Sequence, residues 1–247
     1  MAALICAHRG SCGVPGLAAA ERYGRAIEMG VDYVELDIRR TVDGIRVNYH
    51  DDLTPSGRSA GSLTYRELKA EAGAELLTLD DLLDLVALRV GMHVDLKDPG
   101  DGVETVRAIL ARCPAGGFVV TTGEVESIRA IKAALPTVRV GLTLGADVRN
   151  ARTWATLRER WSELFPDERL KRSGADFVAA HQQLARLRLL RYCARKGIAA
   201  WVWTVDEEAE IARFMADRRV TTVITNRPDI ALRMRAGGQG GANRRSA

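Results

Sequence analysis

Residues 33–51 read "YVELDIRRTVDGIRVNYHD", a buried-strand pattern followed by a turn and a second short strand. An alternation of period two puts Glu35 and Asp37 on one face of the first strand and its aliphatic side chains on the other. The Asp-Gly pair at 43–44 separates two β-branched runs and predicts a β-hairpin. A turn centred there pairs positions that sum to about 87, which places His50 opposite Asp37, with a tolerance of a residue or two. Two carboxylates and a histidine are therefore expected to converge.

The rest of the chain alternates short β-rich runs with amphipathic helical patterns. Apolar residues recur at helical spacing in "GVETVRAILARC" (102–113), "EVESIRAIKAAL" (124–135) and "EEAEIARFMADR" (207–218). The hairpin strand follows its neighbour too closely to begin a new βα unit, so it is not counted as a barrel strand. The other eight strand candidates alternate with helical patterns, and this α/β pattern predicts a (β/α)8 TIM barrel with a β-hairpin extension after strand 2. A doubly wound open sheet is the alternative, and the lack of a GxGxxG loop after the first strand counts against it. The strand candidates are 4–7, 33–38, 45–49, 90–96, 118–122, 138–144, 176–179, 198–205 and 220–225.

Bulk properties indicate an ordinary globular protein: the 247 residues are 47% hydrophobic and 28% charged. One domain is expected over residues 1–235, followed by a tail (236–247) that is flexible by composition. The loop-like residues 53–63 are expected to cover part of the mouth of the barrel. We find no apolar run as long as the ~18 residues of a membrane span and no signal peptide, so reduced cysteines and a cytoplasmic location are expected.

The net charge of +4 is mild, and the basic residues are spread along the chain. Basic and aromatic residues do not interleave as they do in proteins that bind single-stranded nucleic acid. The charge therefore predicts an attraction to small phosphate-bearing ligands and no nucleic-acid partner. The sequence makes no prediction of the oligomeric state.

Two further fragments bring charged and imidazole groups to strand ends. "AHRG" ends the first strand with His8 and Arg9, and "HVDLKDP" puts Asp95 and Lys97 on one strand face. In a (β/α)8 barrel, residues at the carboxyl ends of the strands face one mouth, where active sites form. Each fragment alone is explained as well by an ordinary structural ion pair. Their coincidence with the hairpin residues predicts a single polar site.

The predicted site has the chemistry that phosphodiester cleavage requires. Clustered carboxylates suit Mg²⁺ or Ca²⁺, with Mn²⁺ as a third candidate, and neighbouring cations would hold a phosphate group. A pair of histidines can supply the general acid and the general base, in either order. The predicted metal ligands are Glu35, Asp37 and Asp95, the phosphate-binding residues are Arg9 and Lys97, and the histidine pair is His8 and His50.

The fragments "AHRG", "YVELDIRRTVDGIRVNYHD", "VDLKDP", "WVWTVD" and "ITNRPD" together resemble the glycerophosphodiester phosphodiesterase family of TIM-barrel enzymes, from residue 7 to about residue 229. The resemblance implies hydrolysis of glycerophosphodiesters to glycerol 3-phosphate and an alcohol, with one divalent metal ion as cofactor. It implies the same ligand, phosphate-binding and acid–base residues as above. It also implies that Trp203 forms an aromatic wall against the alcohol part of the substrate. Core packing is the alternative for Trp203 and the expected role of Trp201.

Two departures from the family pattern leave other products open. "PGLAAA" (15–20) replaces a Pro-Glu-Asn-Thr stretch, and Asp95 stands where the family usually has Glu, which is similar to sphingomyelinase D type enzymes. A lysophospholipase D-like or specialised-metabolite enzyme that forms a cyclic phosphate is therefore the alternative. A non-catalytic phosphate-binding barrel is a third reading, which the complete residue set disfavours. Outside the catalytic set, His93 and His181 are expected to be structural, and Thr121 and Thr122 to cap the next helix.

Overall fold

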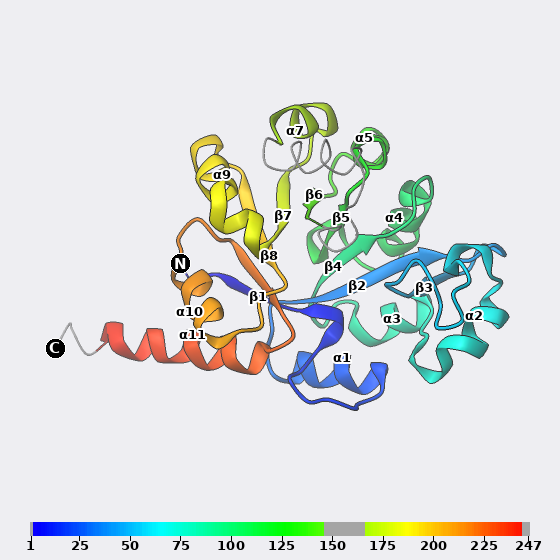
Figure 1. Cartoon of the computed structure of the whole chain (residues 1–247), viewed down its shortest axis with the longest axis horizontal. Coiled ribbons are helices and arrows are strands. Elements are labelled where there is room, and N and C mark those ends of the chain that lie inside the picture. Colours follow the sequence, from blue (N-terminus) through cyan, green and yellow to red (C-terminus); the bar gives the residue numbers. More distant parts are fainter. Residues whose placement is uncertain (1, 146–165, 244–247) are drawn as a thin grey trace.

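The computed structural model describes residues 2–145 and 166–243, in which eight parallel strands close into a barrel surrounded by helices (Figure 1). The circle closes because β2 pairs with both β1 and β4, and β1 pairs with β9. This confirms the predicted (β/α)8 fold. The strands are β1 (Leu4–Ala7), β2 (Tyr33–Arg40), β3 (Arg46–Asn48), β4 (Gly91–Leu96), β5 (Phe118–Thr122), β6 (Val140–Leu144), β7 (Phe177–His181), β8 (Ala199–Trp203) and β9 (Thr222–Thr225).

The helices lie outside the barrel, and the three predicted from their sequence patterns appear as α4, α5 and α10. A π-helical segment at Ala185–Leu189 joins α8 to α9. The helices are α1 (Ala19–Glu28), α2 (Tyr65–Ala72), α3 (Leu79–Val86), α4 (Gly102–Leu110), α5 (Val125–Ala134), α7 (Asp167–Ser173), α8 (Gln182–Leu184), α9 (Leu190–Lys196), α10 (Glu208–Ala216) and α11 (Pro228–Asn243).

Alternation along the strands divides the core into an outer and an inner layer. Outward-facing residues such as Val34 and Leu36 pack against the helices in the larger cluster. The inner layer is apolar where Trp201 contacts Phe177 and Tyr33, with ring centroids 5.2 and 5.0 Å apart. Trp201 is 1% exposed, which confirms its expected packing role. Apolar side chains therefore fill the inside of the barrel near the starts of β2 and β7, and polar side chains are left for the carboxyl ends.

The predicted hairpin forms, with β3 antiparallel to the end of β2, but its register differs by one residue from the central estimate. Ile38 pairs with Asn48, so paired positions sum to 86, and Asp37 faces Tyr49 rather than His50. The cause is the loop length. Thr41 N–H donates to the Ile45 carbonyl at 2.9 Å, which leaves a three-residue loop that ends in the left-handed Gly44 (φ 87°).

The hairpin extension has its own small core, next to β2 and outside the ring of barrel strands (Figure 1). Val47 packs there with Leu63 and Leu68, which joins β3 to the 53–63 loop and to α2. Thr64 begins α2 with a reciprocal capping box to Glu67. The hairpin is therefore held in place by its contacts with the 53–63 loop and α2.

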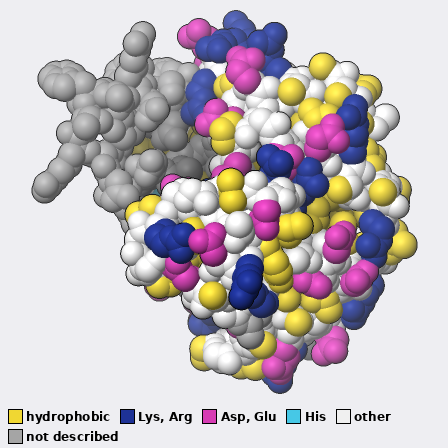
Figure 2. Space-filling model, turned by 90° about the vertical axis from the view of Figure 1, so that its right-hand side faces the viewer, with side chains coloured by type: hydrophobic (Ala, Val, Ile, Leu, Met, Phe, Trp, Pro, Cys, Tyr) yellow, Lys and Arg dark blue, Asp and Glu magenta, His cyan; other side chains and the backbone are white. Residues whose placement is uncertain are grey.

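At the carboxyl end, α11 continues to Asn243 and so extends into the segment predicted as a tail from residue 236. The one-domain division and the flexibility of that segment stay predictions. Among the helices in the described ranges, none combines the length and apolar character needed to cross a membrane. On the face shown in Figure 2, acidic and basic side chains lie interspersed.

Candidate active site

A strained turn directly after β1 brings His8 and Arg9 to the mouth of the barrel. Arg9 has φ 51°, a left-handed conformation uncommon for a residue with a Cβ atom, and Gly10 follows with φ 65°. A Cβ atom on Gly10 would lie 2.4 Å from the Tyr23 ring, so this position requires glycine. The Arg9 backbone N–H donates to Glu35 Oε2 at 2.9 Å, which joins the turn to β2. The "HRG" sequence thus forms a tight, strained turn that places His8 and Arg9, two of the predicted site residues, at the mouth of the barrel.

The three predicted metal ligands meet inside the barrel. Asp37 and Asp95 are paired neighbours on β2 and β4, and Glu35 lies two residues earlier on the same face of β2. All three side chains are buried, and one carboxylate oxygen from each lies within 4.8 Å of the others. Three oxygen donors at this spacing match the preference of Mg²⁺ and Ca²⁺ for carboxylates. The cluster can hold a metal ion.

Two cations compensate part of the negative charge of this cluster. Lys97 Nζ lies 2.5 Å from Asp95 Oδ2 and 2.9 Å from Asp37 Oδ1, and Arg9 Nε lies 3.0 Å from Asp37 Oδ2. Burial alone would raise the pKa of Asp37, but Lys97 and Arg9 outweigh it and hold that pKa at about 2. Burial and the charge of Asp37 raise the pKa of Glu35 well above its usual value. Glu35 therefore holds a proton more strongly than an ordinary carboxyl group, and a divalent cation bound here would compete with that proton.

The two predicted catalytic histidines lie in different surroundings. His8 is largely buried, its Nδ1 lies 2.9 Å from Asn226 Oδ1, and its Nε2 lies 3.7 Å from Glu35 Oε2. Burial and the charge of Arg9 lower the pKa of His8, which favours the neutral ring. The His50 side chain is 43% exposed and contacts the neighbouring Asp51 carboxylate at 2.7 Å. The structure thus brings both imidazoles to the acidic cluster, with His8 in the more buried position and His50 in the more exposed one.

A cavity at the mouth of the barrel connects these groups. It encloses about 480 Å³ of empty space, including open solvent at its entrance. Trp203 lines it and packs edge-on against His181, with ring centroids 5.3 Å apart. None of residues 53–63, which were expected to cover the mouth, lines this cavity. The predicted site residues that do line it are His8, Glu35, His50, Asp95, Lys97 and Trp203, while Arg9 lines the adjoining groove.

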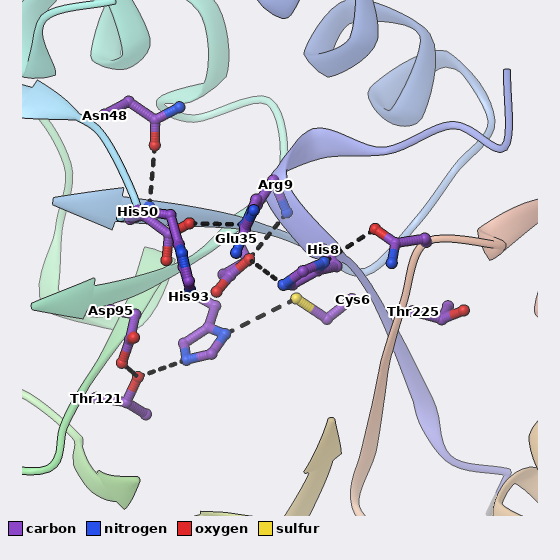
Figure 3. A network of polar contacts seen from close by, with 12 residues as sticks. Cys6, His8, Arg9, Glu35, Asn48, His50, His93, Asp95, Thr121 and Thr225 are labelled. Atoms are coloured by element: carbon purple, nitrogen blue, oxygen red, sulfur yellow. Dashed lines mark hydrogen bonds and ion pairs between the residues drawn. The ribbon is translucent and has the colours of Figure 1, made fainter. Parts of the chain in front are cut away.

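The expectation that Thr121 caps a helix is wrong, because its hydroxyl supports the acidic cluster. Thr121 Oγ1 donates to Asp95 Oδ1 at 2.6 Å and lies 2.7 Å from His93 Nε2 (Figure 3). Since the hydroxyl proton goes to Asp95, Thr121 accepts from a protonated Nε2 of His93. Burial lowers the pKa of His93 to about 4, so its ring is neutral at neutral pH. Thr122 does not cap the helix either, because α5 begins without a side-chain cap. Its hydroxyl accepts from the Glu124 N–H at 3.2 Å in the turn before α5.

Sequence reasoning did not assign several residues that contact the predicted site, either directly or through one other side chain. Asn226 and Asp206 lie in "ITNRPD" and "WVWTVD", where a polar residue follows a buried strand, and this position was the available signal. His93 and Thr121 are joined to Asp95 through hydrogen bonds between neighbouring strands. Figure 3 shows the contacts among His93, Thr121 and Asp95, together with those from His8 and Arg9 to Glu35.

Comparisons with known proteins agree on one family. Residues 8–230 match the model of the glycerophosphoryl diester phosphodiesterase family. The chain is 29% identical over 221 residues to a probable glycerophosphodiester phosphodiesterase 2 of Mycobacterium tuberculosis, covering 84% of this chain and 81% of that protein. It is similar in fold to a glycerophosphodiester phosphodiesterase of Parabacteroides distasonis (TM-score 0.74, 22% identity, 95% and 98% of the two chains). It is also similar to an Oleispira antarctica phosphodiesterase in complex with the product sn-glycerol-3-phosphate (TM-score 0.71, 18% identity, 94% and 96%).

Proposed function

Because the chain belongs to the glycerophosphoryl diester phosphodiesterase family, we propose that it hydrolyses glycerophosphodiesters to glycerol 3-phosphate and an alcohol. The observation that carries the proposal is one cavity lined by two imidazoles, two of the three clustered carboxylates and Lys97, with Arg9 in the adjoining groove. The product held by the Oleispira antarctica phosphodiesterase supports the same substrate class. A cytoplasmic location remains a prediction from the sequence.

The proposed metal ligands are Glu35, Asp37 and Asp95. When bound, Mg²⁺ or Ca²⁺ would supply positive charge against the phosphate oxygens. A bound divalent ion would require all three carboxylates to be ionised, with the proton of Glu35 displaced. The three carboxylates, the two nearby cations Arg9 and Lys97 and the divalent ion would then leave a net charge of about +1, which balances the single negative charge of a phosphodiester. The charge of the protein groups therefore fits a metal-dependent reaction on this substrate.

The two cations are also placed to bind the phosphate group. An ammonium has three hydrogen-bond donors. Lys97 donates one to Asp95 and forms an ion pair with Asp37, so donor capacity remains for a phosphate oxygen. Arg9 is 40% exposed at the border of the cavity and the adjoining groove. Trp203 lines the same cavity and is proposed to contact the alcohol part of the substrate. These residues would orient the diester and stabilise the charge that develops during cleavage.

Proton transfer is proposed to use the histidine pair. One imidazole takes a proton from the attacking oxygen, which belongs to water or to a neighbouring hydroxyl of the substrate, and the other protonates the departing alcohol. Attack by water releases glycerol 3-phosphate directly. Attack by the substrate hydroxyl gives a cyclic phosphate first. Both His8 and His50 line the cavity, as these steps require.

A screen with product identification tests the proposal. Purified protein would be incubated with a panel of glycerophosphodiesters and lysophospholipids in the presence of Mg²⁺, Ca²⁺ or Mn²⁺, and products would be followed by ³¹P NMR. We expect glycerol 3-phosphate to accumulate from glycerophosphodiesters and no reaction in excess chelator. A transient cyclic-phosphate signal would identify attack by the substrate hydroxyl. Failure to cleave every diester with all three metals would contradict the proposed function.

A further inference from the structure

Three polar side chains at the ends of three adjacent strands are linked in a row that ends at His8. Asp206 follows β8, Asn226 follows β9 and His8 follows β1, and these strands are neighbours in the barrel. Asn226 Nδ2 donates to Asp206 Oδ2 at 2.8 Å, and His8 Nδ1 lies 2.9 Å from Asn226 Oδ1. The row thus approaches His8 from the side opposite its Nε2 atom, which lies 3.7 Å from Glu35.

The chemistry of the row fixes the direction of each hydrogen bond. An ionised carboxylate only accepts hydrogen bonds, so Asp206 requires the NH₂ group of the Asn226 amide. The reverse orientation of the amide would put two oxygens at 2.8 Å from each other. Asn226 therefore presents its carbonyl oxygen to His8, and this oxygen can only accept. It follows that Nδ1 of His8 carries a proton, and that Nε2 of the neutral ring is bare.

We propose that Asp206 and Asn226 are positioning residues that hold His8 in the Nδ1-protonated tautomer, with the Nε2 lone pair directed at the cavity. The inference rests on the proposed function, in which His8 transfers a proton. It deepens that function because a bare Nε2 accepts a proton and a protonated Nε2 does not. His8 is thereby assigned as the group that takes the proton from the attacking oxygen, and His50 as the group that protonates the leaving alcohol.

Asp206 also has a structural role, which is distinct from its proposed effect on the tautomer of His8. Asp206 Oδ1 also accepts from the Asn226 backbone N–H at 2.8 Å and from Thr225 Oγ1 at 3.3 Å, and these contacts hold the turn after β9. Ser11 Oγ donates to the Asn226 carbonyl at 2.8 Å and holds the same turn. An asparagine at position 206 keeps an acceptor oxygen for the backbone contact. Asp206→Asn therefore alters the amide row while it preserves the turn.

Asp206→Asn is expected to invert the tautomer of His8. The new NH₂ group at position 206 demands an acceptor, so the Asn226 amide rotates and presents its own NH₂ group to His8 Nδ1. Nδ1 then loses its proton, and Nε2 becomes protonated. The kcat for a glycerophosphodiester should fall about 10²–10⁴-fold, the range for loss of a general base, with little change in KM. In serine proteases, the wrong tautomer of the catalytic histidine costs about 10⁴-fold.

The exchanged pair Asp206→Asn/Asn226→Asp is the rescue variant. Its asparagine donates to the new carboxylate at 226, and that carboxylate accepts from His8 Nδ1, so the original tautomer returns. We expect kcat to recover to within about tenfold of the wild type, since the effect of the new charge beside His8 remains. Asp229→Asn, three residues along the chain from Asn226, is the matched control and should leave both tautomer and kcat unchanged. Asp229 pairs with Arg227 and Arg233.

The tautomer is read directly from ¹⁵N NMR of histidine-labelled protein, because the chain has only four histidines and a variant of each assigns its signals. The inference is supported if Asp206→Asn moves the proton of His8 from Nδ1 to Nε2, kcat falls, and the exchanged pair reverses both. It is overturned if Asp206→Asn leaves the proton on Nδ1, or if the tautomer changes and kcat does not. The proposed function is judged separately by the product screen, so the two failures are distinguishable.

Discussion

The base of the site and its edge are held in place by different means. We call Glu35, Asp37, Asp95 and His8 the floor, and the end of the hairpin with His50 the rim. Floor residues lie on barrel strands or directly after one, they are buried or nearly so, and their positions follow from the strand register. The rim lies outside the barrel, and its histidine is 43% exposed. The floor is thus preorganised by the strand register, while the position of the rim depends on side-chain contacts.

Removal of the two histidines gives the largest expected effect. His8→Ala and His50→Ala should each lower kcat about 10²–10⁴-fold, because each removes one partner of the acid–base pair. Added imidazole should restore His50→Ala more than His8→Ala, since the side chains are 43% and 16% exposed and a solvent molecule reaches the rim more easily. Steady-state kinetics with and without imidazole, with unfolding temperatures as the control for folding, measure both effects. Equal rescue of the two variants would remove the distinction between floor and rim, and wild-type rates in either would remove that histidine from the mechanism.

A pH-dependent loss of stability is expected from His93, which supports the floor. Burial lowers the pKa of His93 to about 4 in the folded protein, against about 6.5 for an unfolded chain. Between these values the unfolded chain binds more protons, so the folded protein loses stability as the pH falls, by about 3 kcal/mol over the whole window. Of this, about 2 kcal/mol should be lost by about pH 5.

Urea unfolding of the wild type and of His93→Gln at about pH 7.5 and about pH 5 measures this difference. Glutamine keeps an N–H donor for Thr121 and does not titrate, so the variant should lose about 2 kcal/mol less than the wild type on acidification. The same pH dependence in His93→Gln and in the wild type would contradict the role given to the floor.

Metal affinity should depend on the floor alone. Glu35→Gln removes one of the proposed carboxylate ligands and should weaken Mg²⁺ or Ca²⁺ binding by about tenfold or more. For the wild type, affinity should rise with pH, because burial and Asp37 raise the pKa of Glu35 and protons compete with the metal there. Isothermal titration calorimetry measures both trends. Asp51→Asn, which changes a rim carboxylate beside His50, is the matched control, and an equal loss of affinity in both variants would contradict the assignment of the metal site.

The difference between floor and rim also explains which features of the site could be predicted from the sequence. Period-two alternation places Glu35 and Asp37 on one face of β2 without any knowledge of the rest of the chain, and the floor carboxylates were found in this way. The register of the hairpin differed by one residue, because a two-residue and a three-residue loop around Asp43 and Gly44 look alike in sequence.

Contacts between strands far apart in the sequence were beyond such patterns. Thr121 precedes a helix, so local rules indicate a cap, yet its neighbours across the sheet are Asp95 and His93. Asp206 and Asn226 approach His8 only because the barrel closes between β9 and β1. Local rules therefore find residues that point into a site, and tertiary contacts decide how those residues are oriented.

The smallest expected effect comes from Arg39, which holds the rim. Its side chain is 8% exposed, and its guanidinium donates to the His50 carbonyl at 3.2 Å, to Asp52 at 2.7 Å and to Asp98 at 2.6 Å. Arg39→Ala releases the segment that carries His50 but leaves the floor intact. We expect kcat to fall about three- to tenfold, less than the loss from a removed acid–base group. The imidazole of His50 remains in this variant, and only its position is less firmly held.

The neighbouring Arg40, whose side chain is 51% exposed, supplies the matched control, and Arg40→Ala should keep the wild-type kcat. Arg39→Lys retains the charge but loses the planar fork that reaches three acceptors, so its kcat should lie between those of Arg39→Ala and the wild type. A metal titration of Arg39→Ala should match the wild type, since no ligand on the floor has moved. If Arg39→Ala instead loses metal affinity together with kcat, then rim and floor are one unit, and the separation of a preorganised floor from a rim held by side-chain contacts is wrong.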